Sequence, residues 1–267
     1  MFDAQTRADQ QPPAARHPEA PAAAPRFEVS WAKHLDEVRE SQRLRWRVFV
    51  DEMGARPTVS PDAPPYHDVD RFDEFCEHLM VRVVDGIGPG TLVGTYRVLT
   101  PSAAARAGGL YSETEFDLAP VRPLCARAVE LGRSCVHPSW RTGGVILALW
   151  GALGEFMLRH RLDTMVGCAS VGMSDGGHHA ASLWRQLSET HLVAPQWQVQ
   201  PHHALPLAGL CDTLDVETPA LIKGYLRCGA KVLGAPAWDP VFNTADLPML
   251  MRIDELPARY RRHFLEG

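Results

Sequence analysis

The chain has 267 residues and a formal net charge of −5 at pH 7, so nothing in its overall charge attracts nucleic acid. Its 45% hydrophobic residues allow a sizeable core, but no apolar run is long enough to span a membrane and no signal peptide is visible. The 6 cysteines form neither a CxxC motif nor a Cys/His cluster. We therefore expect a cytoplasmic protein with reduced thiols and no metal site.

The N-terminal part of the chain predicts a tail followed by a helix. Residues 1–26 are rich in Ala and Pro, and we expect them to be disordered, with one folded domain over residues 27–267. Ser30 is a candidate N-cap for a helix over residues 30–49.

That helix carries a basic stripe. Arg39, Arg43 and Arg47 are spaced four apart, so they share one face of the helix. Such a stripe is most often a solvated surface, and the alternative is a site for an acidic partner or an anionic substrate.

An acidic segment follows the proline-rich loop over residues 57–65. It contains Asp68, Asp70 and Asp73, but it lacks the glycine and the terminal Glu of an EF-hand calcium loop. The segment therefore predicts either a solvated turn or a polar substrate pocket.

Two β-strands are expected next, over residues 78–84 and 92–99, joined by a glycine-rich turn. Arg97 lies inside the second strand. A loop with aromatic anchors is expected over residues 108–118.

The central stretch reads as a strand, a turn and a buried helix, over residues 128–136 and then 145–158. A helix that begins directly after a strand directs its free N–H groups and positive dipole end towards the end of the strand. Arg141, Gly143 and Gly144, in the turn, are therefore candidates for binding a phosphate or pyrophosphate.

Glu130 and Arg133 interrupt the apolar character of this strand. They are three residues apart, so a regular strand would direct them to opposite faces. Such charges are costly inside a sheet unless they act in function. The alternative is a structural ion pair or a pair at the strand end that faces water.

The rest of the chain alternates strands and helices. His178 and His179 are expected in a loop or at a helix start rather than at a zinc site, because no third ligand is spaced to join them. The remaining elements are strands over 164–170, 231–236 and 247–253, and helices over 219–228 and 257–264, the last one basic. This order predicts the α/β class, with a mixed (α+β) sheet flanked by helices.

The turn from Arg141 to Ile146 resembles the pyrophosphate turn of the GNAT acyltransferase superfamily, Arg/Gln-x-x-Gly-x-Gly/Ala. Arg141 and Gly144 fit that pattern, whereas Ile146 replaces the last small residue and argues against ordinary acetyl-CoA. The resemblance implies a GNAT-like fold, in which two central parallel strands splay apart and admit the thioester arm of the acyl donor.

Four further segments resemble one branch of that superfamily, the N-acyl amino acid synthases typified by the L-ornithine Nα-acyltransferase family. They are Arg45–Ala55, Val93–Leu99, Glu130–Val136, and Leu221–Arg227 with Phe242–Thr244. The N-terminal half also resembles acyl-homoserine-lactone synthases through Arg47, Asp68, Asp70, Arg97, Glu130 and Arg133. That second resemblance fades in the C-terminal half.

The resemblance implies a lipid-biosynthetic N-acyltransferase. It would move a 3-hydroxyacyl chain from acyl carrier protein to the α-amine of ornithine, giving lyso-ornithine lipid in the first step of ornithine lipid synthesis. The acyl thioester would be a co-substrate, with no permanently bound cofactor, and peripheral contact with the inner membrane stays open. The alternatives are a lactone synthase that uses S-adenosylmethionine and a non-catalytic sensor or scaffold.

The resemblance also implies roles for individual residues. Glu130 is the candidate base for the α-amine, which is mostly protonated at pH 7, and Arg133 and Ser134 join it in catalysis. Backbone N–H groups of the strand around Ser134 to Val136 are expected to bind the oxyanion. Substrate binding is assigned to Arg47, Asp68, Asp70 and Arg97, and binding of the donor's phosphopantetheine to Cys135, Val136, Arg141, Gly143 and Gly144.

Within the substrate site, Arg97 or Arg133 would bind the carboxylate of ornithine, and Asp68 and Asp70 its side-chain ammonium. The acidic carrier protein would dock on the basic stripe or on the basic C-terminal helix.

Overall fold

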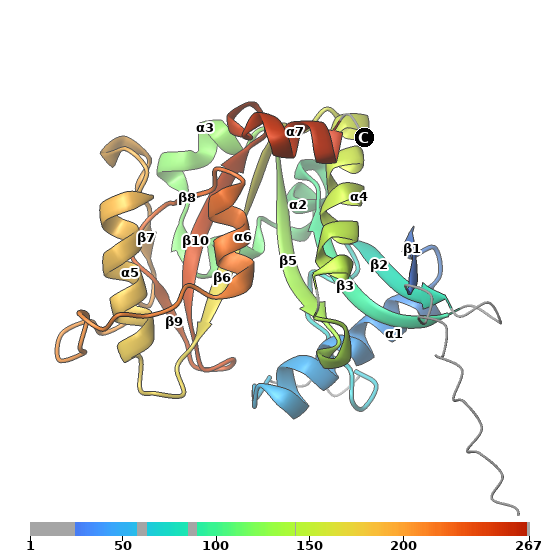
Figure 1. Ribbon diagram of the computed structural model, residues 1–267, viewed down its shortest axis with the longest axis horizontal. Coiled ribbons are helices and arrows are strands. Elements are labelled where there is room, and N and C mark those ends of the chain that lie inside the picture. Colours follow the sequence, from blue (N-terminus) through green and yellow to red (C-terminus); the bar gives the residue numbers. More distant parts are fainter. Residues whose placement is uncertain (1–24, 58–62, 85–89, 142, 266–267) are drawn as a thin grey trace, which may run out of the picture.

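An eight-stranded sheet organises the protein, which a computed structural model describes over residues 25–57, 63–84, 90–141 and 143–265 (Figure 1). The strand order is β1-β2-β3-β5-β6-β10-β8, with β9 paired to β10. The strands are β1 (Arg26–Trp31), β2 (Glu77–Val84), β3 (Thr91–Leu99), β5 (Ala128–Val136), β6 (Thr164–Gly172), β8 (Lys231–Val232), β9 (Ala237–Asp239) and β10 (Thr244–Arg252). A separate pair is formed by β4 (Phe116–Asp117) and β7 (Gln200–Pro201).

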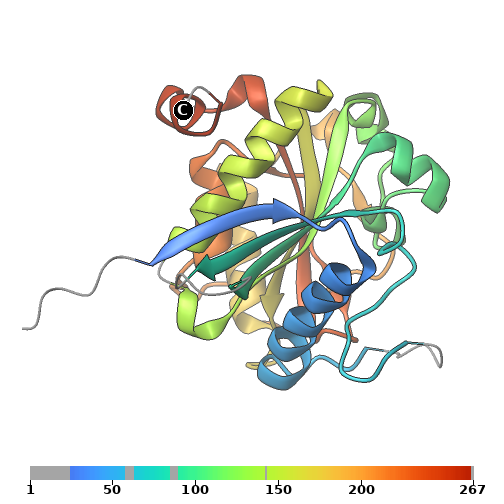
Figure 2. The same cartoon turned by 90° about the vertical axis from the view of Figure 1, so that its right-hand side faces the viewer.

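Helices cover both faces of this sheet, because alternate residues of its strands are apolar on either side. In β2, Leu79 and Val81 pack with Leu149 on one face, while Met80 packs with Leu44 on the other. The helices are α1 (Leu35–Trp46), α2 (Pro101–Ala107), α3 (Arg122–Cys125), α4 (Gly144–His160), α5 (His178–Thr190), α6 (Ala220–Arg227) and α7 (Ala258–Leu265). Figure 2 shows α1 (blue) and α4 (yellow-green) on opposite sides of the strands.

Shorter helical segments connect these elements. A π-helix, η1 (Arg47–Glu52), continues α1, and the 3-10 turns are η2 (Tyr111–Thr114), η3 (Ala119–Val121), η4 (Pro138–Trp140), η5 (Pro195–Trp197) and η6 (Ile253–Glu255). No helix of the described chain is both long and apolar enough to cross a membrane.

The central parallel strands part, as the GNAT resemblance implies. β5 and β6 pair in parallel only from Ala128 opposite Thr164 to Glu130 opposite Val166, and then separate (Figure 1). Gly167 lies where they separate, and a Cβ there would stand 2.3 Å from the carbonyl oxygen of Leu131. A residue without a side chain is therefore needed at the point where the gap opens.

The sequence prediction is wrong at the N-terminal helix. Ser30 does not cap it, because Ser30 lies in β1 opposite Met80 of β2. The helix starts at Leu35, where the Glu37 carboxylate accepts hydrogen bonds from the backbone N–H groups of Lys33 (2.7 Å) and His34 (3.1 Å). Pairing with β2 therefore overrides the local capping preference of Ser30.

The other predicted elements differ mainly in length. The strands expected over 78–84, 92–99, 128–136 and 164–170 match β2, β3, β5 and β6, and the central helix matches α4. β10 starts earlier than expected and β8 is shorter. Residues 1–24, 58–62 and 85–89, which hold most of the expected tail and parts of two expected loops, lie outside the described residues.

Candidate active site

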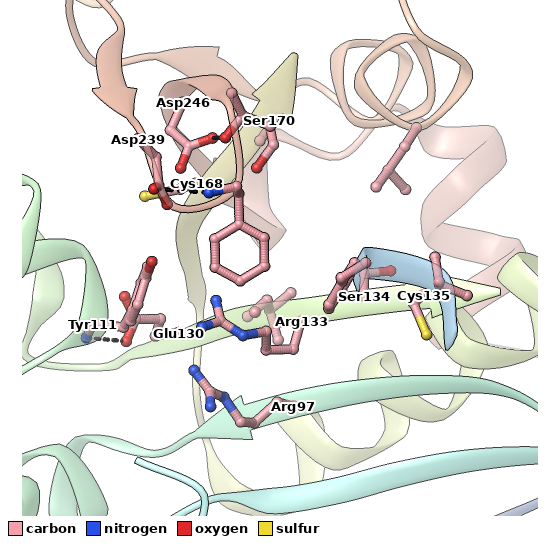
Figure 3. A pocket seen from close by; sticks show the side chains of 18 of the residues that line it. Arg97, Tyr111, Glu130, Arg133, Ser134, Cys135, Cys168, Ser170, Asp239 and Asp246 are labelled. Carbon is pink, nitrogen blue, oxygen red and sulfur yellow. Dashed lines mark hydrogen bonds between the residues drawn. The ribbon is translucent and has the colours of Figure 1, made fainter. Parts of the chain in front are cut away.

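A cavity of about 290 Å³ lies beside the gap between β5 and β6 (Figure 3). Its polar wall includes Arg97, Tyr111, Glu130, Arg133, Asp239 and Asp246. Figure 3 shows Asp239 and Asp246 on one side of the cavity and Arg97 on the other, with Glu130 and Arg133 between them.

Glu130 is held in a fixed position at the cavity wall. Its side chain accepts hydrogen bonds from the backbone N–H groups of Tyr111 (2.6 Å) and Ser112 (2.7 Å) and from the Ser112 hydroxyl (2.5 Å). Burial raises the pKa of Glu130, and the hydrogen bonds from Ser112 and Tyr111 oppose that rise because they stabilise the charged form. The result is an oriented carboxylate that is a better proton acceptor than an exposed one.

A β-bulge corrects the expected placement of Arg133. Opposite β3, Arg133 and Ser134 together face Tyr96, and Arg133 has φ 51°, in the left-handed region. The extra residue reverses the alternation of the strand, so Glu130 and Arg133 both reach the cavity instead of opposite faces.

A buried ion-pair network contacts the arginines of the cavity. Arg45 is 0% exposed, and it bonds Asp68 (Nε to Oδ2, 2.7 Å) and Asp73 (Nη2 to Oδ1, 2.8 Å). Asp68 also lies 3.3 Å from Nε of Arg133. Neither Arg45 nor Asp73 was among the predicted site residues, although Arg45 opens the first of the family-like segments.

Asp70 completes the network between the two cavity arginines. Its carboxylate lies 2.6 Å from Nη1 of Arg97 and 3.1 Å from Nη2 of Arg133. Burial alone would raise the pKa of Asp70, but Arg97 and Arg133 outweigh burial and lower it to about 2. Asp68 and Asp70 thus already hold arginine partners, and their contact with ornithine stays a prediction.

In the turn expected to bind the acyl donor, Arg141 already has protein partners. Arg141 forms a two-pronged ion pair with Glu52 (2.5 and 2.8 Å), and its Nε donates to the carbonyl oxygen of Val136 at 3.1 Å. Gly143, with φ 96°, precedes α4, and a Cβ on Gly144 would stand 2.9 Å from the ring of Phe27. Their phosphopantetheine contacts stay predictions.

The end of β5 presents backbone rather than a reactive thiol. The Cys135 side chain packs with Leu44 and Val48, and burial raises its pKa to about 12, so it is not a thiolate at neutral pH. The N–H of His137 donates to the Val93 oxygen in β3, at 2.8 Å. Because N–H directions alternate along a strand, the N–H of Val136 faces the gap.

Arg47 lies outside the cavity wall. It is exposed, and its Nη1 stands 3.2 Å from Nε2 of His137, just beyond the end of β5. Its role in substrate binding stays a prediction.

Two smaller, mostly apolar cavities, of about 50 and 40 Å³, share lining residues with the main one. Leu131 and Tyr225 line all three. Met165 and Met251 line both smaller cavities, and Trp150 and Phe264 line the last. Apolar cavities lined by residues of α4, α6 and α7 therefore adjoin the main cavity.

A second acidic group was missed by the sequence analysis. Carboxylate oxygens of Glu115, Asp239 and Asp246 lie within 4.8 Å of one another, as a metal site or an ammonium site requires. Glu115 is more than a hundred residues from Asp239 and Asp246 along the chain, so no local motif signals the cluster.

Comparison with known proteins shows the family to which the chain belongs. Residues 44–151 match the family described as Acetyltransferase (GNAT) domain. Over 265 residues the chain is 35% identical to the L-ornithine N(alpha)-acyltransferase of Rhodobacter capsulatus, which covers 91% of this chain and 96% of that protein. The chain belongs to the L-ornithine Nα-acyltransferase family.

Another member of the family, from Agrobacterium fabrum, is 34% identical over 253 residues, covering 89% of this chain and 85% of that protein. Membership makes the chain an enzyme, an N-acyltransferase, and removes the non-catalytic alternative.

Solved structures agree on the fold. The AHL synthase LasI superposes with a TM-score of 0.54 at 13% identity, covering 91% of this chain and 97% of that one. The CoA-dependent acyl-homoserine lactone synthase BjaI gives 0.51 at 18% identity, with 91% and 92% covered. At these identities the likeness shows a shared GNAT-like architecture and nothing about the acceptor.

Proposed function

We propose that the enzyme transfers a 3-hydroxyacyl chain from acyl carrier protein to the α-amine of ornithine, giving lyso-ornithine lipid. The observation that carries this proposal is that a charged site and apolar space adjoin at one gap. The first feature is the carboxylate of Glu130 with Arg97 and Arg133, and the second is the pair of apolar cavities beside the main one. A free amino acid needs the first feature, and a long acyl chain needs the second.

Glu130 accepts the proton of the attacking amine, directly or through a water. The amine nitrogen then bonds to the thioester carbon, and the carbon–sulfur bond breaks as the thiolate leaves. General-base help of this kind contributes about 10² to 10⁴ in rate. The N–H of Val136, which faces the gap, is the proposed donor to the oxyanion.

Arg97 and Arg133 bind the α-carboxylate of the acceptor, since both guanidinium groups line the cavity. Asp68 and Asp70 act through them, because their ion pairs hold the two arginines in place. In this proposal both aspartates are positioning residues.

The acyl chain lies along the path from Leu131 and Tyr225 towards Met251. Burial of apolar surface there contributes about 0.8 kcal/mol per methylene, so a long chain is bound far better than an acetyl group.

The acidic carrier protein docks on the stripe of Arg43 and Arg47, both of which are exposed. Arg47 stands beside His137, next to the donor turn at the end of β5. Figure 1 shows α7, the other basic helix, at the opposite end of β5, so the stripe is the better candidate. Because the product is a lipid, the proposal includes peripheral contact of the enzyme with the inner membrane.

The purified enzyme with 3-hydroxypalmitoyl acyl carrier protein tests the proposal. Ornithine and S-adenosylmethionine are offered in parallel, and products are read by mass spectrometry. We expect acyl-ornithine, lost in Glu130→Gln. A homoserine lactone, or no product with either carrier-protein or CoA donors, overturns the proposal. Raising the salt concentration should increase KM for the carrier protein, less so in Arg47→Ala.

A further inference from the structure

The acidic cluster of Glu115, Asp239 and Asp246 opens into the reaction cavity. Asp239, at the end of β9, and Asp246, in β10, both line it, and Glu115 reaches them from the segment between η2 and β4. Two distant parts of the chain, the segment before β4 and the paired strands β9 and β10, therefore bring carboxylates to one point of the cavity.

The described part of the chain supplies no ion-pair partner for this cluster. Among the described residues, no Lys, Arg or His forms an ion pair with any of the three carboxylates. On the opposite side of the cavity the aspartates have arginine partners. Buried acids without a counter-charge are costly unless a ligand supplies one.

The carboxylate of Glu115 lacks a counter-charge. Both of its oxygens are closed to solvent, and although the Tyr111 side chain and the Asp246 carboxyl lie beside them, neither oxygen accepts a hydrogen bond of regular geometry from the described residues. Burial, followed by the neighbouring Asp246 carboxylate, raises the pKa of Glu115 to about 8, and burial also raises that of Asp246. By contrast, Oδ1 of Asp239 accepts backbone N–H bonds from Val241 (2.7 Å) and Phe242 (3.1 Å).

The cluster is connected to the reaction centre. The sulfur of Cys168, whose environment includes Glu115 and Asp246, lies 3.5 Å from the Ser112 hydroxyl that bonds Glu130. On the arginine side, the guanidinium of Arg133 stands 5.0 Å from the ring centroid of Tyr111. The cavity therefore offers a base, a carboxylate-binding arginine and an uncompensated acidic end.

We infer that Glu115, Asp239 and Asp246 bind the side-chain ammonium of the acceptor amino acid and so select a basic acceptor. This inference rests on the proposed function. It assigns the ammonium to a cluster different from Asp68 and Asp70, which already neutralise arginines. With the ammonium in the cluster and the carboxylate on Arg133, the α-amine lies between them, beside Glu130.

The test compares ornithine with norvaline, which has the same carbon chain but no side-chain amine. For the wild type, kcat/KM should be higher for ornithine by about 10² to 10³, the usual effect of losing one partner of a buried charge pair. In Asp246→Asn and Glu115→Gln this ratio should collapse, mainly through KM for ornithine, while the rate with norvaline is retained. Glu155→Gln, an exposed acid on α4, is the matched control and should keep the wild-type ratio.

Three outcomes separate the inference from the proposed function. If the wild type acylates ornithine but both variants keep the wild-type ratio, the inference is wrong and the function stands. If the ratio collapses instead in Asp70→Asn, the ammonium belongs to the other set of acids. If Mg²⁺ or Mn²⁺ binds stoichiometrically in calorimetry, and Asp246→Asn abolishes that binding, the cluster is a metal site and the inference is overturned. Unchanged circular dichroism shows that the variants fold.

Discussion

The hydroxyl of Ser112 donates a hydrogen bond of 2.5 Å to Oε1 of Glu130, so a residue of the turn η2 orients the proposed base on β5. The same carboxylate also accepts two backbone N–H bonds from η2. A 3-10 turn that no sequence pattern marked as functional thus orients the central acid and opposes the rise of its pKa that burial causes.

Ser112→Ala should raise the pKa of Glu130, because a hydrogen bond to its charged form is lost. Since the base acts deprotonated, the acidic limb of the kcat/KM profile should move to higher pH, and kcat should fall about tenfold at neutral pH. The pH profile with ornithine checks this. Ser112→Thr keeps a hydroxyl and should restore the wild-type limb, and an unshifted limb in Ser112→Ala would count against Glu130 as the base.

The free energy of unfolding should decrease as pH rises from about 5 to 8. The pKa of Glu115 is raised to about 8 in the folded state, so between its unfolded pKa and 8 the folded protein holds one proton more than the unfolded chain. The contribution of Glu115 to the free energy of unfolding is then fully present below its unfolded pKa. This contribution is lost as pH rises through 8, by at most about 1.4 kcal/mol per pH unit. The groups that face Glu115 are Asp239, Asp246 and Tyr111.

Urea unfolding across this pH range checks the slope. Glu115→Gln cannot bind the extra proton, so the difference between the two proteins isolates this group from other titrating residues. Equal slopes in both proteins would show that Glu115 is ionised throughout. Saturating ornithine should reduce the loss of stability, because the ammonium stabilises the charged acids.

Arg45→Met should lower the free energy of unfolding by about 3 to 5 kcal/mol, because it leaves Asp68 and Asp73 buried without their partner. Arg39→Met, on the same helix but in a solvent-accessible pair with Asp36, should change stability by less than about 0.5 kcal/mol. Chemical denaturation of both variants gives the comparison. Equal losses would mean that the buried network contributes no more than a surface pair.

Glu52→Gln should release Arg141 from its ion pair and lower KM for the acyl donor about two- to fivefold, as expected for a partly exposed pair. Steady-state kinetics with varied acyl carrier protein measure this, while KM for ornithine should stay constant. Arg141→Gln should raise KM for the donor, and the double variant should behave like Arg141→Gln. A lower KM that persists in the double variant would exclude Arg141 as the group released.

The sequence by itself determined the parts of this protein that depend on neighbouring residues. The run of residues that became β5, the donor turn and α4 is a local pattern of apolar spacing and glycine placement. The family-like segments are equally local. For that reason the fold class, the family resemblance and the presence of Arg97, Glu130 and Arg133 in predicted strands were accessible before any coordinates.

Only the tertiary structure decided which side chains meet. The bulge at Arg133 exists because β5 must match β3, and it reverses the face that simple alternation predicts. Arg45 and Asp68, 23 residues apart, form a buried pair because α1 packs against the loop before β2. Glu115 and Asp246 meet because β10, the last strand of the chain, lies between β6 and β8 in the sheet rather than at its edge. Long-range strand pairing and burial set these contacts, and neither leaves a local signature in the sequence.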